Sequence, residues 1–245
     1  MKFQNILLLK MKHTKLIPIL VLASALSSSA ATVAGSFRDI QFSNIDFTNQ
    51  VVELHNFGSD TIALDGWRFC SHDETDGFDY TSSSGLNGQS IAAGESFFIH
   101  WSNDADPTAA NALNISSLGG NWIDDLNASS SGEAVSINLY NNNLGGFGSS
   151  AAIGDHIQYS FDGANIGSPA NVRGGVATNA NIWGDTSDWI SVNGDSTGIS
   201  LNVGQQFTGV DLTQGSNSFS VQSIPEPSSA LLSSLGLLFL LRRKR

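Results

Sequence analysis

The chain has 245 residues, with 22 Asp and Glu against 11 Lys and Arg, and a formal net charge of −11. The basic residues are concentrated near the two ends, and only Arg38, Arg68 and Arg173 lie between residues 16 and 241. A strongly acidic body is repelled by phosphate backbones, so nucleic-acid binding is disfavoured. Cys70 is the only cysteine, which excludes a disulfide within the chain. We expect its side chain to be a small buried group.

The N-terminal segment has the three parts of a secretory signal peptide. Lysines precede an apolar run that begins at Leu16, and small residues follow from Ser27 to Gly35. We therefore predict that residues 1–34 are a helical signal peptide that is removed after export. The alternative is a retained membrane anchor, for which the apolar run is shorter than the roughly 20 residues that a span needs.

The C-terminal segment combines a proline bracket, an apolar run and a basic cluster. Pro225 and Pro227 interrupt any helix and hold Glu226 in an extended segment. Residues 230–241 are apolar except for two serines, which predicts a short hydrophobic helix. The basic cluster is Arg242, Arg243, Lys244 and Arg245. These basic residues would stay on the cytoplasmic side of a membrane.

This order of features at residues 223–245 resembles the PEP-CTERM sorting signal. The resemblance implies that an exosortase, a membrane enzyme similar to cysteine transpeptidases, recognises Pro225, Glu226 and Pro227. It implies that the transmembrane helix anchors the protein transiently in the inner membrane, with the basic cluster as the stop-transfer signal. It also implies delivery to the cell surface or extracellular matrix. The alternative is an ordinary single-span anchor.

Short alternating segments dominate the body between residues 36 and 222. Apolar and polar residues alternate in five segments, at 52–56, 67–70, 97–101, 135–139 and 156–161. This period of two is typical of half-buried strands, and Gly, Asn, Asp and Ser fill the turns between them. The pattern predicts an all-β antiparallel sandwich or barrel. Late strands near residues 189–190 and 199–203 would complete a sheet, and little regular structure is expected at 102–131 and 163–181.

The segment from Val52 to Trp67 resembles the opening of the lamin-tail domain. A strand leads to an Asn-x-Gly turn at Asn56 and then to a Leu-x-Gly-Trp corner that ends at Trp67. Gly-Glu pairs later precede two further apolar strands. The resemblance covers about residues 38–162 and implies an immunoglobulin-like antiparallel β-sandwich that mediates interactions without catalytic residues. We therefore expect a lamin-tail-like domain at residues 35–162 and a β extension of the body at 163–222.

The Leu-x-Gly-Trp corner at Gly66 and Trp67 also has a simple steric explanation. Gly66 permits a backbone turn that a side chain would block, and Trp67 can then pack as the largest core residue.

One acidic cluster is a candidate calcium site. Asp73, Glu74, Asp76 and Asp79 supply the hard oxygen ligands that calcium prefers. Their spacing does not match the EF-hand pattern, so a solvated acidic turn is the alternative. Asp104, Asp106, Asp124 and Asp125 form a weaker second candidate. No other cofactor is expected.

No spacing of residues predicts an enzyme. The histidines do not follow a zinc-binding pattern, and a Cys70–His72 pair would need a third, orienting group. We therefore predict an exported, non-enzymatic surface or extracellular-matrix protein. Its sandwich would bind a partner, either an extracellular polysaccharide or a second copy of the chain.

The alternative is a secreted carbohydrate-binding module or carbohydrate-active enzyme with an acidic groove. An exposed tryptophan beside paired carboxylates would favour this alternative, and Trp122 is the best placed candidate.

Overall fold

The computed structural model describes residues 37–73, 77–102, 107–163, 172–206 and 213–224. The predicted signal peptide, the Pro-Glu-Pro motif, the apolar run and the basic cluster lie outside these ranges. So do four of the candidate calcium ligands, which are Glu74, Asp76, Asp104 and Asp106. Within the described ranges no helix has the length and apolar character needed to cross a membrane.

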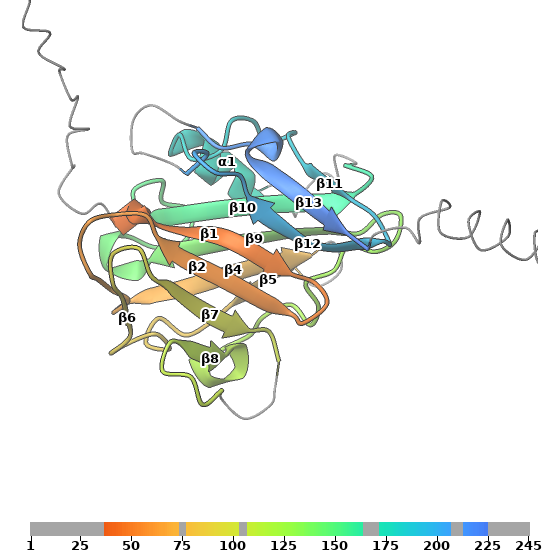
Figure 1. Ribbon diagram of the computed structural model, residues 1–245. Coiled ribbons are helices and arrows are strands. Elements are labelled where there is room, and N and C mark those ends of the chain that lie inside the picture. Colours follow the sequence, from red (N-terminus) through yellow and green to blue (C-terminus); the bar gives the residue numbers. More distant parts are fainter. Residues whose placement is uncertain (1–36, 74–76, 103–106, 164–171, 207–212, 225–245) are drawn as a thin grey trace, which may run out of the picture. The chain divides into compact units, whose positions relative to one another are not determined.

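The body is built mainly from two β-sheets (Figure 1). The first has the order β13 (Phe219–Ser223), β12 (Ser196–Leu201), β1 (Ile40–Asp46), β2 (Val51–Asn56), β7 (Ser96–His100) and β8 (Ala112–Asn114). The second has the order β11 (Ile190–Val192), β10 (Ile153–Phe161), β9 (Ala134–Asn141), β4 (Trp67–Asp73) and β5 (Gly77–Tyr80). A separate small pair joins β3 (Ile62–Ala63) and β6 (Ser90–Ile91). The mostly β fold agrees with the predicted all-β sandwich.

Most neighbouring strands are antiparallel, as predicted, but each sheet has one parallel pair near an edge. These pairs are β7 with β8 and β10 with β11. The sheets are therefore mixed, and the expectation of a purely antiparallel body is wrong at these two places. Both β8 and β11 have only three residues. A late strand was predicted near residues 189–190, but its parallel direction could not be read from so short a segment.

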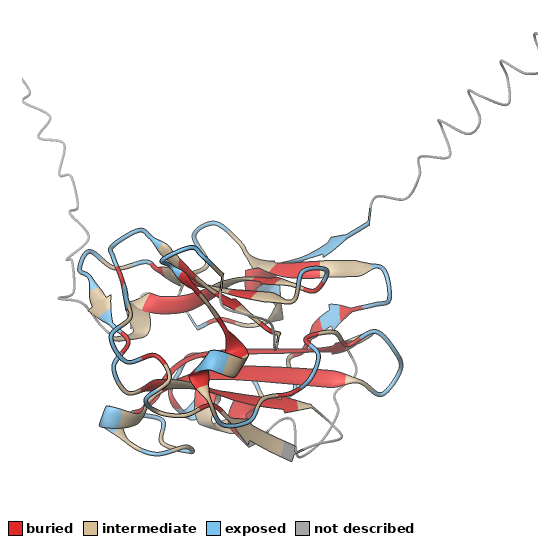
Figure 2. Cartoon of the chain, turned by 90° about the horizontal axis from the view of Figure 1, so that it is seen from below, coloured by how far each residue is buried: buried red, intermediate tan, exposed pale blue. Residues whose placement is uncertain are grey.

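The core lies between the inner faces of the two sheets. Phe42 of the first sheet packs near Phe69 of the second, with ring centroids 6.4 Å apart. The backbone N–H of Phe42 also donates to Asp155 Oδ2 across the same interface, at 2.6 Å. Trp67 is 1% exposed, which confirms its predicted core position. Figure 2 shows the buried residues concentrated in the strands and the exposed residues in the connections.

The central strands of the second sheet are buried on both faces. The side chains on the face that points away from the first sheet are polar, and include Ser136, Asn138, His156 and Gln158. The helix α1 (Val172–Asn179) covers part of this face, because a Cβ atom at Gly174 would lie 2.6 Å from Gln158 Oε1. Half-burial was the wrong expectation for β9 and β10, since a covering layer hides their polar face from solvent.

The sequence pattern misses β1, β3, β5, β6, β8, β13 and α1. The segment of α1 was expected to lack regular structure, because VRGGVATN contains two adjacent glycines and no helical apolar stripe. At 102–131 the described residues contain little regular structure, as predicted, namely β8 and the short 3₁₀ helix η2 (Ile115–Leu118). Burial of Ala112, Ile115 and Leu118 against the core accounts for order in that segment.

The corner before β4 has the predicted geometry. Gly66 has a φ of +79°, and a Cβ atom there would lie 2.4 Å from Asn143 Nδ2. Asn143 donates from this nitrogen to the Asp65 carbonyl oxygen at 2.8 Å. Glycine is therefore required at the corner both for its backbone conformation and for the close approach of Asn143.

Candidate functional site

A shallow pocket of about 260 Å³ lies beside Trp122. It is lined by Asp79, Gly120, Asn121, Trp122 and Asp124. Trp122 is half-buried, whereas Trp67, Trp101, Trp183 and Trp189 are each at most 5% exposed. The pocket thus contains the one tryptophan of the chain that is only partly buried, next to two carboxylates.

The backbone on both sides of Trp122 is fixed to the second sheet. On one side, the Asn121 N–H donates to the Tyr80 carbonyl oxygen at 2.9 Å. On the other, the Ile123 N–H donates to Ser71 Oγ at 3.1 Å. The Ile123 carbonyl oxygen accepts from Trp101 Nε1 at 2.7 Å. The ring of Trp122 is therefore presented by a loop segment that buried hydrogen bonds hold in place.

Gly120 allows the loop to approach β5 closely. Its φ is +85°, and a Cβ atom there would lie 2.3 Å from the Tyr80 carbonyl oxygen. Asp79, which lies opposite Ser71 in the β4–β5 pairing, comes from the strand itself. The pocket is thus assembled from β5 and from a loop some 40 residues later in the sequence.

The predicted acidic clusters are only partly brought together. Asp79 of the first cluster and Asp124 of the second line the same pocket. Asp73 lies at the end of β4, and Glu74 and Asp76 lie outside the described ranges. In the part of the chain that the structure describes, no three His, Cys, Asp or Glu side chains are grouped closely enough to hold a metal ion. Calcium binding stays a prediction.

Cys70 and His72 lie on the same face of β4 and both are buried. Burial raises the pKa of the Cys70 thiol to about 11, so the thiol stays protonated at neutral pH. Burial also lowers the pKa of His72. This environment suits the predicted buried, unreactive cysteine and gives no support to a nucleophile.

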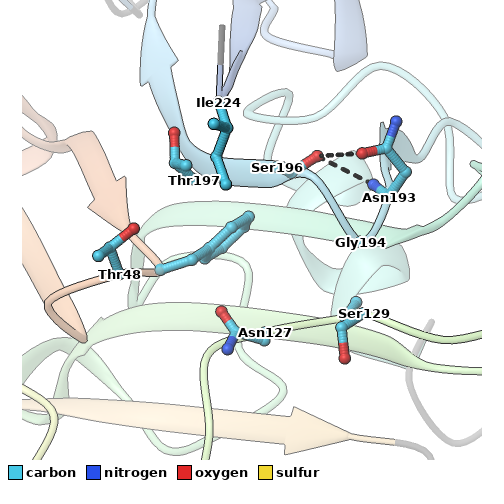
Figure 3. Close-up of a pocket in the computed structure, with 10 residues that line it drawn as sticks. Thr48, Asn127, Ser129, Asn193, Gly194, Ser196, Thr197 and Ile224 are labelled. Carbon is cyan, nitrogen blue, oxygen red and sulfur yellow. Dashed lines mark hydrogen bonds between the residues drawn. The ribbon is translucent and has the colours of Figure 1, made fainter. Parts of the chain in front are cut away.

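A second pocket, of about 170 Å³, was not predicted. Figure 3 shows its lining of hydroxyl and amide side chains, with Ile224 above them. Ser196 Oγ accepts from the Asn193 N–H at 2.9 Å and donates to Asn193 Oδ1 at 3.2 Å. The lining residues come from four separate segments and carry no charge, so no local sequence pattern marks them. Ile224, which precedes the Pro-Glu-Pro motif, donates its N–H to the Asp195 carbonyl oxygen at 3.1 Å.

Comparison with protein families supports the sorting signal. A family model described as the PEP-CTERM protein-sorting motif matches residues 223–245. A search among curated proteins finds no match. The matched segment begins at Ser223, the last residue of β13. The match indicates that this chain is an exported protein that exosortase recognises and sorts to the cell surface.

Proposed function

We propose that the protein is a non-enzymatic component of the cell surface or extracellular matrix, whose β body binds a partner after exosortase has sorted it. The observation that carries this proposal is the sorting motif at residues 223–245, which begins at the final residue of the last strand of the body. The basic residues Arg242 to Arg245 would hold the tail until sorting, and the helix before them would anchor it transiently in the inner membrane.

The body itself is proposed to be an immunoglobulin-like sandwich of the lamin-tail type. The support is the succession of β2, the Gly66–Trp67 corner and β4, followed by strands that come after Gly-Glu pairs. Under this proposal, residues 35–162 are the lamin-tail-like domain. Residues 163–222 are its extension, from which β11, β12 and β13 add to the two sheets.

The sorting proposal is tested by intact mass of the protein from membrane and matrix fractions of its native cells. We expect the matrix form to lack both the N-terminal signal peptide and the residues after the motif. Replacing Glu226 with Ala should leave unprocessed chain in the membrane fraction, whereas replacing the basic cluster with four Gln should weaken membrane retention and mis-sort the protein. Cells that lack exosortase supply the control. Identical masses and fractions for the variants and the wild type would contradict the proposal.

A second candidate function is carbohydrate binding at the Trp122 pocket. An indole face can stack on the C–H groups of a sugar ring, while the carboxylates of Asp79 and Asp124 accept hydrogen bonds from its hydroxyls. This combination favours the alternative function of a secreted carbohydrate-binding module over self-association.

The test for this candidate is affinity electrophoresis of the full chain through gels that contain extracellular polysaccharides. We expect Trp122→Ala to lose at least about fivefold in affinity, because stacking on an aromatic ring contributes roughly 1 kcal/mol or more. Leu144→Ala removes a side chain that is 48% exposed and does not line this pocket, and it serves as the matched control. Equal retardation of both variants would exclude the pocket as the binding site.

A further inference from the structure

Two of the three arginines of the body gather at one place on the outer face of the second sheet. Arg68 on β4 lies with its Cζ atom 3.6 Å from the centroid of the Phe147 ring. Arg173 on α1 lies with its Cζ atom 5.6 Å from the same centroid and 4.7 Å from that of Phe78. In a body that carries a large excess of carboxylates, two guanidinium groups beside the same aromatic ring are unexpected.

The described polar contacts of these two guanidinium groups are made to neutral groups. Arg68 Nη2 donates to Asn142 Oδ1 at 2.7 Å, and Arg173 Nη2 donates to the Tyr80 hydroxyl at 3.1 Å. Arg38 is different, because its guanidinium donates to three backbone carbonyl oxygens, those of Ile153, Ala180 and Ser150. Arg38 therefore has a structural role, whereas Arg68 and Arg173 keep donor capacity.

Buried donors without a hydrogen-bond partner converge on the same place. They are Arg68 Nε, Arg173 Nε and the Tyr140 hydroxyl. Tyr140 is 1% exposed and lies directly opposite Arg68 in the β4–β9 pairing. Both ring nitrogens of the buried His72, farther along the same face of β4, also have no partner. Leaving a buried donor without an acceptor is unfavourable, so a group of such donors is suited to an acceptor that a ligand supplies.

The surroundings give this cluster an entrance and an apolar wall. The Tyr80 ring stacks on Phe147 with centroids 4.1 Å apart, and Phe147 also meets the Tyr140 ring edge-on. Arg68 is half-buried, and Gly146 and Gly148 beside Phe147 are exposed. A Cβ atom at Gly148 would lie 3.3 Å from Arg173 Nη1, so glycine keeps this side of the cluster open. Aromatic walls lower the local dielectric and strengthen any ion pair formed there.

We propose that Arg68, Arg173 and Tyr140 form a binding site for a single carboxylate group, separate from the Trp122 pocket. The two guanidinium groups would supply charge-assisted donors, and the Tyr140 hydroxyl would supply a third donor. Two cationic groups beside the same aromatic ring give this part of an otherwise acidic body a local preference for a negatively charged group. The carboxylate comes either from a free sugar acid or from a uronate unit of a polysaccharide.

The test is isothermal titration calorimetry of the full-length protein with sodium galacturonate at constant ionic strength. Galactose, which lacks the carboxylate, is the uncharged control ligand. We expect galacturonate to bind and galactose not to bind. Arg68→Gln should weaken binding at least about tenfold, because it removes a charged donor. Arg38→Gln changes the net charge equally and should keep the wild-type affinity. Tighter binding of an oligogalacturonate would assign the polysaccharide source, and equal binding would assign the free sugar acid.

The Tyr140→Phe variant distinguishes a binding role of these residues from a purely structural one. Because the hydroxyl donates to no acceptor in the free protein, the variant should melt near the wild-type temperature, yet bind galacturonate at least about tenfold more weakly. The proposal is overturned by equal binding of galactose and galacturonate. It is also overturned if Tyr140→Phe binds galacturonate as the wild type does.

Discussion

At the scale of single residues, the junction of the two sheets contains two adjacent buried ionisable groups. Asp155 points toward the first sheet and accepts from Phe42, while its Oδ1 has no partner. Burial raises the pKa of Asp155 to about 7. His156 points to the opposite face, where Nδ1 lies 2.6 Å from Asn138 Oδ1 and Nε2 lies 3.0 Å from Gln158 Oε1. Burial lowers the pKa of His156 to about 4.

These two pKa shifts affect stability in opposite directions. Folded Asp155 binds its proton more tightly than the unfolded chain, so its contribution to stability is lost as pH rises from about 4 through 7. Folded His156 binds its proton less tightly, so its contribution is lost as pH falls from about 6.5 to 4. In the wild type the two effects offset each other between these limits.

Each single substitution should reveal the contribution of the other residue. Relative to the wild type, His156→Gln should gain melting temperature on going from pH 7 to pH 5, because only Asp155 then responds. Asp155→Asn should lose melting temperature over the same change. Thermal melts at the two pH values measure both effects, and parallel changes in the two variants would contradict the assignment.

At the scale of elements, alternation in the sequence predicts β2, β4, β7, β9 and β10, because each has at least five residues and one apolar face. Their register and the covering of β9 and β10 could not be predicted, since these depend on contacts with α1 and with distant strands. Part of the Trp122 pocket could be predicted from the sequence, because Trp122 and Asp124 are only two residues apart. Asp79 joins them only through the pairing of the Gly120 segment with β5.

The helix α1 provides a test of how far contacts between distant segments determine the fold. Gly174→Ala should destabilise the fold by about 1–3 kcal/mol, because the new methyl group meets Gln158 Oε1. Gln158 cannot readily move away, since its Nε2 donates to the Thr186 and Asp188 carbonyl oxygens. Gly175→Ala is the matched control, with its nearest neighbour, Thr186 Cγ2, at 3.9 Å. Helix propensity should make this variant more stable by roughly 0.5–1 kcal/mol. Urea unfolding of both variants gives the comparison, and equal effects would show that α1 is not held as described.

At the scale of the whole molecule, the sorting signal and the folded body share residues. The matched motif begins at Ser223, which pairs with Ser196 of β12, and the next residue, Ile224, is hydrogen-bonded to Asp195. β13 is the edge strand of the first sheet, and of its residues only Phe219 is buried. A strand with so little buried surface opens at low cost, so its end can leave the sheet while the remainder stays folded.

This overlap predicts that the pairing of β13 limits how fast exosortase processes the chain. Directly opposite residues of antiparallel strands lie about 4.5–5.5 Å apart, which suits a disulfide. The double variant Ser196→Cys with Ser223→Cys should therefore lock the strand end and slow the appearance of the processed mass in exosortase-containing membranes. Reductant should restore the rate, and so should a flexible Gly-Ser insertion between Ile224 and Pro225, because each frees the motif from the strand. The single Ser196→Cys variant controls for the substitution itself. An oxidised double variant that is processed as fast as the wild type would show that exosortase accepts the motif while β13 remains fully paired.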